Sequence, residues 1–138
     1  MLLRSTLLAA LLATPTLAQE ITLIEPAIMA WDKTTEGVAF APLQGDRFAG
    51  PYQAMVRLPA GTVSPMHVKS ANMFGVMIAG RMTHVAEGSS TAEPQIIGPG
   101  SFYAIPADLP HISACVSIVP CVAYLYQDAA FDFVPVQQ

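Results

Sequence analysis

Prolines spread along this chain limit what it can fold into. Eight of its twelve prolines lie between residues 51 and 120, at Pro51, Pro59, Pro65, Pro94, Pro99, Pro106, Pro110 and Pro120. Proline lacks a backbone N–H and clashes with the preceding helical turn, so a long helix is not expected there. Only residues 26–36, PAIMAWDKTTE, have room for a helical turn or two. The chain is therefore expected to be built from strands.

Five stretches have the composition of β-strands. They are residues 52–60, 72–88, 101–107, 111–118 and 121–127, rich in Val, Ile, Tyr, Phe and Met and separated by Gly and Pro. Many short strands with frequent turns are typical of a β-sandwich or a β-barrel. No internal repeat or linker divides the chain, so we predict a single all-β domain.

The first 18 residues, MLLRSTLLAALLATPTLA, have the pattern of a secretory signal peptide. One positive charge at Arg4 precedes the apolar run Leu7–Ala13, and small residues end the segment at Ala18. The apolar run is too short to span a bilayer, and no other stretch is long enough. We predict cleavage after Ala18, a mature domain of residues 19–138, and a periplasmic or secreted location without a membrane span.

The charge balance argues against a nucleic-acid partner. The chain has six Lys and Arg residues against ten Asp and Glu residues. A protein that neutralises phosphates needs a basic patch, and this sequence has none. Apolar residues make up 53% of the chain, which predicts a well-filled interior and not a disordered segment.

Cys115 and Cys121 are the two cysteines of the chain. An exported protein meets an oxidising compartment, so an even pair of cysteines predicts a disulfide. The intervening residues, VSIVP, suggest a tight turn that joins two strands as a hairpin. Two buried free thiols are the alternative interpretation.

Residues 61–80, GTVSPMHVKSANMFGVMIAG, have the outline of a metal-binding hairpin. Gly61 is followed after five residues by His67, with Lys69 two positions on. Three residues then separate Lys69 from Met73, and six more separate Met73 from Gly80. The spacing of these five residues forms the first of two motifs in the chain.

The second motif begins at Gly100. Five residues later come Pro106 and Asp108, and His111 follows Asp108 after two residues. In order and spacing the two segments resemble the two motifs of the cupin superfamily, and the resemblance extends over roughly residues 30–133. The stretches LQGDRFAGPYQAMVRLPAGT, GPGSFYAIPADLPH and LYQDAAFDF resemble a bacterial exported single-domain cupin subfamily of unassigned function. The resemblance implies a small antiparallel barrel, or jelly roll, with a central pocket and no open sheet edges.

The resemblance also implies four site positions. The family holds its metal with two His and one Glu from the first motif and one His from the second, which correspond here to His67, Lys69, Met73 and His111. Protonated Lys offers only hydrogen-bond donors, and Met offers a weak, soft sulfur. Catalytic metal sites usually keep three protein ligands. We therefore expect four ligand-binding positions at a degenerate site without an obligatory metal, and His67 and His111 as the remaining metal ligands.

Two further sources of ligands for a divalent metal or copper remain open. His84 would add a third imidazole if it faced inward, but a rim or surface position is expected, because the family takes no ligand from that strand. Soft sulfur with imidazole suits Cu(I). Four methionines cluster near His67, namely Met66, Met73, Met77 and Met82. Filling of the barrel core is the simpler role for them.

Other positions around the motifs have more than one interpretation. Lys69 either binds an anion beside His67 and His111, acts as an acid or base, or reaches solvent with its head while its stem packs. Aromatic candidates for the pocket wall are Tyr52, Phe74, Phe102 and Tyr103, of which strand alternation lets only one of the last two face inward. Asp108, between two prolines, is expected to be a turn residue.

These features predict an exported cupin-fold protein that binds a small polar or anionic ligand. The rival is a metal-dependent cupin enzyme, an oxygenase, isomerase or hydrolase, that uses His67 and His111 with an unusual third ligand. A sensor or accessory domain acting through a protein partner ranks below both. A homodimer formed by sheet packing follows from the resemblance alone.

Overall fold

The structure is a computed structural model that describes residues 20–89 and 93–137. The predicted signal peptide and its cleavage site lie outside the described residues. Within the described part, no helix has the length and apolar character needed to cross a bilayer. The residues expected to hold a helical turn contain one short 3₁₀ helix, η1, Pro26–Ile28.

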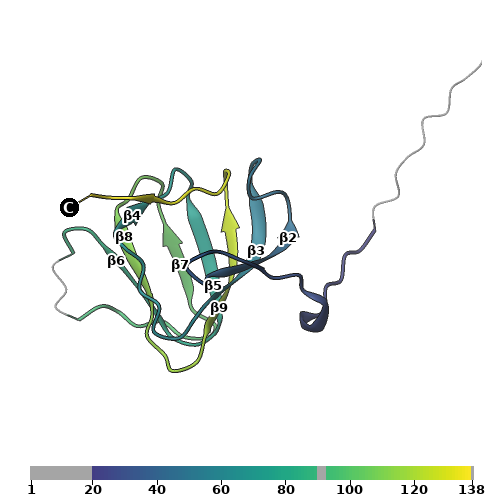
Figure 1. Ribbon diagram of the computed structural model, residues 1–138, viewed down its shortest axis with the longest axis horizontal. Coiled ribbons are helices and arrows are strands. Elements are labelled where there is room, and N and C mark those ends of the chain that lie inside the picture. Colours follow the sequence, from purple (N-terminus) through teal and green to yellow (C-terminus); the bar gives the residue numbers. More distant parts are fainter. Residues whose placement is uncertain (1–19, 90–92, 138) are drawn as a thin grey trace, which may run out of the picture.

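Over residues 20–89 and 93–137, ten strands form two antiparallel sheets that face each other, and the closed shape is visible in Figure 1. The larger sheet has the order β1-β2-β3-β9-β5-β7. Its strands are β1 Asp32–Lys33, β2 Ala39–Gln44, β3 Tyr52–Leu58, β9 Cys121–Gln127, β5 Met73–Ala79 and β7 Phe102–Ile105. The smaller sheet has the order β10-β4-β8-β6. Its strands are β10 Val134–Pro135, β4 His67–Val68, β8 His111–Cys115 and β6 Met82–Ala86. The prediction of a small all-β antiparallel barrel is confirmed.

Strand alternation decides which side chains face the interior. In β9, Cys121, Ala123, Leu125 and Gln127 are buried, while the residues between them are half-buried on the outer face. The strands β3 and β5 alternate in the same way and flank β9 on its two sides. Successive side chains of a strand point to opposite faces, so the inner faces of these three strands supply one wall of the interior.

Sequence patterns did not reveal which strand belongs to which sheet. The hairpin predicted over residues 61–80 is wrong, because β4 and β5 lie in different sheets. The run 72–88 is also divided, since the chain leaves β5 at Gly80, with a φ of 77°, and enters the other sheet as β6. Glycine adopts this left-handed conformation at little cost, which allows the sharp crossing.

Cys115 and Cys121 form a disulfide, as predicted. The predicted hairpin between them is wrong, because β8 and β9 belong to opposite sheets. The bond therefore links the two sheets at one end of the barrel. There the two sulfurs pack with Met77, Met82 and Ala123 in a buried cluster. This cluster fills that end of the barrel.

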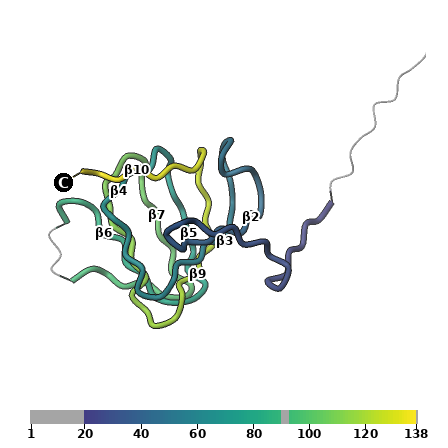
Figure 2. The backbone as a smooth tube through the Cα atoms, in the orientation of Figure 1, coloured from purple at the N-terminus to yellow at the C-terminus, as the bar shows by residue number. Residues whose placement is uncertain are grey.

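The C-terminal residues cross the barrel after β9. We call residues 128–137 the strap. Figure 2 shows it running from the end of β9 toward β4. Its strand β10 pairs with β4, with Val134 opposite Val68 and Pro135 opposite His67. The backbone N–H of Phe131 donates to the carbonyl of Arg47 at 2.6 Å. The strap is thus bonded to the smaller sheet through β4 and to the loop that joins β2 and β3 of the larger sheet.

Candidate functional site

A cavity of about 650 Å³ lies inside the barrel. Its lining comes from both sheets, from the segment between β1 and β2, and from the strap. The polar or charged lining residues are Thr34, Glu36, Thr62, Ser64, His67, Lys69, His84, Tyr103, Ser113 and Gln127. Val63 and Phe133, which also line the cavity, are 64% and 40% exposed. The cavity therefore reaches solvent between the strap and the loop before β4.

His67 and His111 face each other across the paired strands β4 and β8. Their Cα atoms are register partners, and their ring centroids lie 4.3 Å apart. The Nδ1–H group of His67 donates to the carbonyl of Pro65 at 3.0 Å, and that of His111 donates to the carbonyl of Leu109 at 2.8 Å. Each ring is thereby held with Nε2 as an acceptor. Nε2 of His111 is buried and has no partner within the described chain.

Burial keeps both imidazoles neutral. It lowers the pKa of His67 to about 4, against the hydrogen bond to Pro65, which raises it. Burial also lowers the pKa of His111, and the nearby Lys69 charge acts in the same direction. Two neutral rings with fixed tautomers can accept hydrogen bonds, but they do not attract an anion by charge.

His84 lies inside the barrel, so the expected rim or surface position is wrong. It lines the cavity, and its ring centroid is 4.4 Å from that of Tyr103. Its Nδ1 lies 2.8 Å from the hydroxyl of Ser113, and its Nε2 is buried without a partner in the described residues. Burial lowers its pKa to about 4, with further contributions from His111 and His67. The available signal was alternation, because Met82 and His84 share a face of β6.

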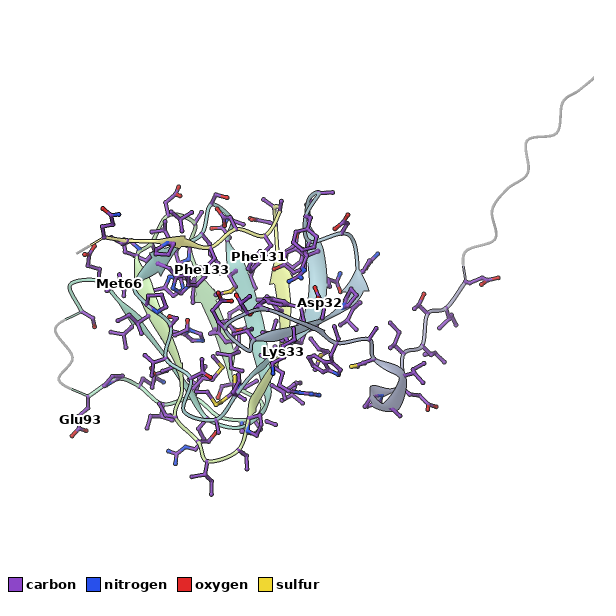
Figure 3. The ribbon with its side chains drawn as sticks, viewed as in Figure 1. Asp32, Lys33, Met66, Glu93, Phe131 and Phe133 are labelled. Carbon is purple, nitrogen blue, oxygen red and sulfur yellow. A yellow bond between two sulfur atoms is a disulfide. The ribbon has the colours of Figure 1, made fainter. Side chains whose placement is uncertain are left out.

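Lys69 points into the barrel and does not reach bulk solvent. It is 8% exposed, and its ammonium donates to the backbone carbonyl of Asp132 at 2.8 Å. Nζ also lies 4.3 Å from the ring centroid of Phe131 and 5.6 Å from that of Phe133. Both rings come from the strap and are labelled in Figure 3. We call the Asp132 carbonyl and these two rings the lysine cage.

The lysine cage contains no ion pair. The side-chain carboxylate of Asp132 accepts instead from the backbone N–H of Ser70, at 3.0 and 3.1 Å. Within the described residues the one salt bridge joins Arg47 to Asp32. Burial lowers the pKa of Lys69 to about 8, while the Asp132 charge opposes this change. Lys69 is thus a positive charge whose nearest fixed partners are a carbonyl and two aromatic faces.

Met73 and Tyr103 complete the lining near these groups. Met73 is 7% exposed on the inner face of β5. Tyr103 lies opposite Gly75 in the β5–β7 register, and a Cβ on Gly75 would approach the Tyr103 ring to 2.2 Å. The glycine therefore leaves the space that the ring occupies. Burial raises the pKa of Tyr103 to about 12, so its hydroxyl stays protonated.

The remaining predicted wall residues divide between the two faces. The hydroxyl of buried Tyr52 donates to Oε1 of Gln127, which leaves the buried Nε2 of Gln127 without a partner in the described chain. Phe102 is 64% exposed and points outward while Tyr103 points inward, as alternation requires. Phe74 stacks on Tyr126 and does not line the cavity. Asp108 occupies a turn with a φ of 59°.

The four positions implied by the motifs do not fit a site for a hard divalent metal. His67, Lys69 and Met73 line one cavity, and His111 packs against His67, but only the two histidines can act as ligands for a hard ion. The described residues contain no group of three His, Cys, Asp or Glu placed to hold a metal ion. Met73 and Met82 line the cavity, while Met77 is packed in the buried cluster beside the disulfide.

Comparisons with solved structures address the fold. The polyketide cyclase RemF from Streptomyces resistomycificus is 14% identical, with a TM-score of 0.67 over 86% of this chain and 87% of that one. An RmlC-like cupin from Shewanella frigidimarina is 10% identical, with a TM-score of 0.64 over 82% and 95% of the two chains. The chain has the cupin fold. The resemblance predicted from the two motifs is confirmed at this level.

A third cupin-fold neighbour is KdgF from Halomonas sp., 16% identical with a TM-score of 0.61 over 78% of this chain and 94% of that one. No protein-family model matches the sequence. No curated protein sequence matches it either. At these identities the likeness extends to the fold and not to an activity, because cupins carry many unrelated functions on one barrel.

Two site residues lie outside both motifs, and the sequence assigned them no role. Phe131 and Phe133 line the cavity of this cupin barrel and form part of the lysine cage. They belong to the stretch FDF, whose alternation of apolar and polar residues is too short to predict a strand. Their position depends on where the strap crosses the barrel, which local sequence patterns do not specify.

Proposed function

We propose that the protein is an exported binding protein that takes a small organic molecule with a polar or anionic group into the barrel cavity. The observation that supports this proposal most is the lysine cage. Lys69 is a buried cation without a carboxylate partner among the described residues, and it lines a cavity of about 650 Å³. Burying a charge without a counter-charge is costly, so an anionic ligand there would gain a strong partner.

Other hydrogen-bond donors and apolar surfaces in the cavity indicate further properties of the ligand. Nε2 of Gln127 and Oγ1 of Thr34 belong to lining residues and make no hydrogen bond within the described residues, and Tyr103 lines the same cavity. The apolar part of the lining includes Val56, Leu58 and Leu125. A suitable ligand therefore has hydrogen-bond acceptors at one end and an apolar body. The disulfide is compatible with the predicted export.

A melting experiment tests the proposal. A panel of small carboxylates and their neutral amide counterparts would be added to the folded protein, and the melting temperature would be recorded. A ligand that binds only the folded state raises the melting temperature. We expect carboxylates to raise it more than amides, and Lys69→Met to remove the difference while Lys33→Met keeps it. Equal responses to both sets in the wild type would contradict the proposal.

A metal-dependent enzyme is the second candidate, and one observation favours it. Both His67 and His111 donate Nδ1–H to a backbone carbonyl, an arrangement that metal-ligating histidines commonly have. Stoichiometric metal that survives chelator treatment of the purified protein would support this candidate against the first.

A double variant tests the metal interpretation by restoring the two missing metal ligands of the family. Lys69→His with Met73→Glu replaces the cation and the soft sulfur by an imidazole and a carboxylate. If the binding-protein proposal is right, the wild type binds Zn²⁺, Ni²⁺ or Mn²⁺ weakly and the double variant binds at least one of them much more tightly. Calorimetric metal titration of both proteins measures the difference. A folded variant without gained affinity would show that the four positions do not converge.

A further inference from the structure

Lys69 combines burial, access to a cavity and a single fixed hydrogen bond. An ammonium has three N–H donors, and here one of them bonds to the Asp132 carbonyl. The other two have no hydrogen-bond acceptor within the described residues, where the further contacts of Nζ are with the rings of Phe131 and Phe133. Its only fellow lysine, Lys33, is exposed on β1. Lys69 is therefore the lysine of this chain that a molecule inside the cavity would meet.

The geometry points to Lys69 as a nucleophile that captures an aldehyde or ketone in the cavity as an imine. This inference goes beyond reversible binding, although it rests on the proposed entry of small molecules into the cavity. The neutral amine attacks the carbonyl carbon and forms a C–N bond, while the C=O electron pair moves to oxygen. A proton moves from nitrogen to that oxygen. The resulting hydroxyl then takes up a second proton, the one that the ammonium released when it became the neutral amine. The C–O bond breaks, water leaves, and a protonated imine remains.

The lysine cage suits the product better than the free ammonium. A protonated imine keeps the single positive charge, which would stay over the faces of Phe131 and Phe133. It has one N–H donor, and the Asp132 carbonyl supplies one acceptor. Conversion of the ammonium to a protonated imine thus removes the two N–H donors that have no hydrogen-bond acceptor. It keeps the one N–H donor that bonds to the Asp132 carbonyl. Leaving buried donors without partners costs free energy, so this change is favourable.

Neighbouring groups can move the proton that the reaction requires. His67 stands two residues before Lys69, so both side chains face the cavity, and Nδ1 of His67 is already bonded to the Pro65 carbonyl. Its other ring nitrogen can accept a proton from the attacking amine and return it to the departing oxygen.

Reductive trapping tests the inference. The folded protein would be incubated with 4-carboxybenzaldehyde and sodium cyanoborohydride, which reduces an imine to a stable secondary amine. This probe has an aldehyde, an aromatic body and a carboxylate. Peptide mass mapping would then compare labelling at Lys69 and Lys33 in the same molecule. We expect Lys69 to be labelled at least roughly tenfold faster. Equal or slower labelling at Lys69 would overturn the inference.

Variants and a matched ligand separate this inference from the proposed function. Lys69→Arg keeps the charge and should abolish the fast label, whereas Lys33→Arg should leave it unchanged. The alcohol 4-(hydroxymethyl)benzoate cannot form an imine, so its saturable binding measures reversible entry alone. Binding of the alcohol without fast labelling by the aldehyde would overturn only the imine step. Failure of the alcohol to bind would contradict the proposed function. If Lys69→Arg does not fold, the comparison of two lysines in the wild type still decides.

Discussion

Gly75 shows how a single absent side chain shapes the site. The ring of Tyr103 lies where a Cβ on Gly75 would be, with a separation of 2.2 Å. The same ring then contacts His84 and lines the cavity. One glycine in β5 thus permits a contact between β7 and β6, which lie in different sheets.

Gly75→Ala is expected to destabilise the fold by about 1–3 kcal/mol, because the added methyl group must push the Tyr103 ring out of its place. Urea unfolding of the variant measures this change. Gly50→Ala is the control, since a Cβ there meets nothing within 4 Å. It should change stability by no more than about 0.5 kcal/mol. Unfolding of Gly75→Ala at the wild-type midpoint would contradict the position of the ring.

The three histidines make stability depend on pH in a defined window. An unfolded histidine has a pKa near 6.5, whereas His67 and His84 titrate at about 4 in the fold and the pKa of His111 is also lowered. As pH falls below about 6.5, the unfolded chain takes up protons first, so the free energy of unfolding decreases. The contribution is fully present above this pH and is lost as pH falls toward about 4.

We expect the urea midpoint to fall between about pH 7 and about pH 5, where carboxylates still titrate little. His84→Gln should show a shallower fall, because one buried imidazole no longer has to be kept neutral. Chemical unfolding at several pH values, on wild type and variant, provides the measurement. A midpoint independent of pH over this range would show that the three rings are not buried as described.

At the scale of strands and connections, the disulfide holds two elements that do not pair with each other. It joins the end of β8 to the start of β9, and these strands lie in opposite sheets. A link of this kind restrains how the sheets separate when the barrel opens.

Replacing both Cys115 and Cys121 by Ala is expected to lower the free energy of unfolding by about 2 kcal/mol, from the chain entropy of a short closed loop. The separation of the two cysteines is six residues, which makes this loop contribution small. Urea unfolding of both proteins, with and without dithiothreitol, measures the loss. The reductant should destabilise the wild type and leave the double variant unchanged. A double variant as stable as the oxidised wild type would contradict the expectation.

Most strands could be predicted from the sequence, but their allocation to sheets could not. Alternation and composition identified the regions of β3, β5, β6, β7, β8 and β9. The strand β2 was missed because Pro42 interrupts its pattern, and β4 and β10 have two residues each, too few for periodicity. The cupin motifs predict that Lys69 and Met73 point inward, and both residues line the cavity. The predicted rim position of His84 is wrong, because it follows the family's ligand set, which takes no ligand from this strand. Strand alternation alone places His84 on the same face as Met82, which lines the cavity.

The whole molecule presents an apolar outer face on its larger sheet. Phe102 and Ile78 are 64% and 52% exposed, and Phe74 stacks on Tyr126 on the same side. The outward residues of β5, β7 and β9 are thus largely aliphatic or aromatic. An exposed apolar sheet face of this kind favours association with another surface.

We expect this face to pack against its copy in a homodimer, as the cupin resemblance implies. Light scattering coupled to size-exclusion chromatography should give twice the monomer mass for the wild type. Phe102→Asp should give a monomer, because it places a charge on the most exposed aromatic residue of this face, where the partner would bury it. Ile118→Asp is the control, since Ile118 is 99% exposed in the turn beside the disulfide. A wild type that stays monomeric at high concentration would contradict this expectation.

The strap also determines when, during synthesis, the cavity can be completed. Lys69 and Asp132 are 63 positions apart, so the amine is made long before its cage. A ribosome can have released every residue of β2–β9 while one wall of the cavity is still missing. Contacts between distant residues form slowly in folding. Docking of the strap is therefore expected to be a late step in maturation, and the cavity of a newly made barrel would lack this wall until that step is finished.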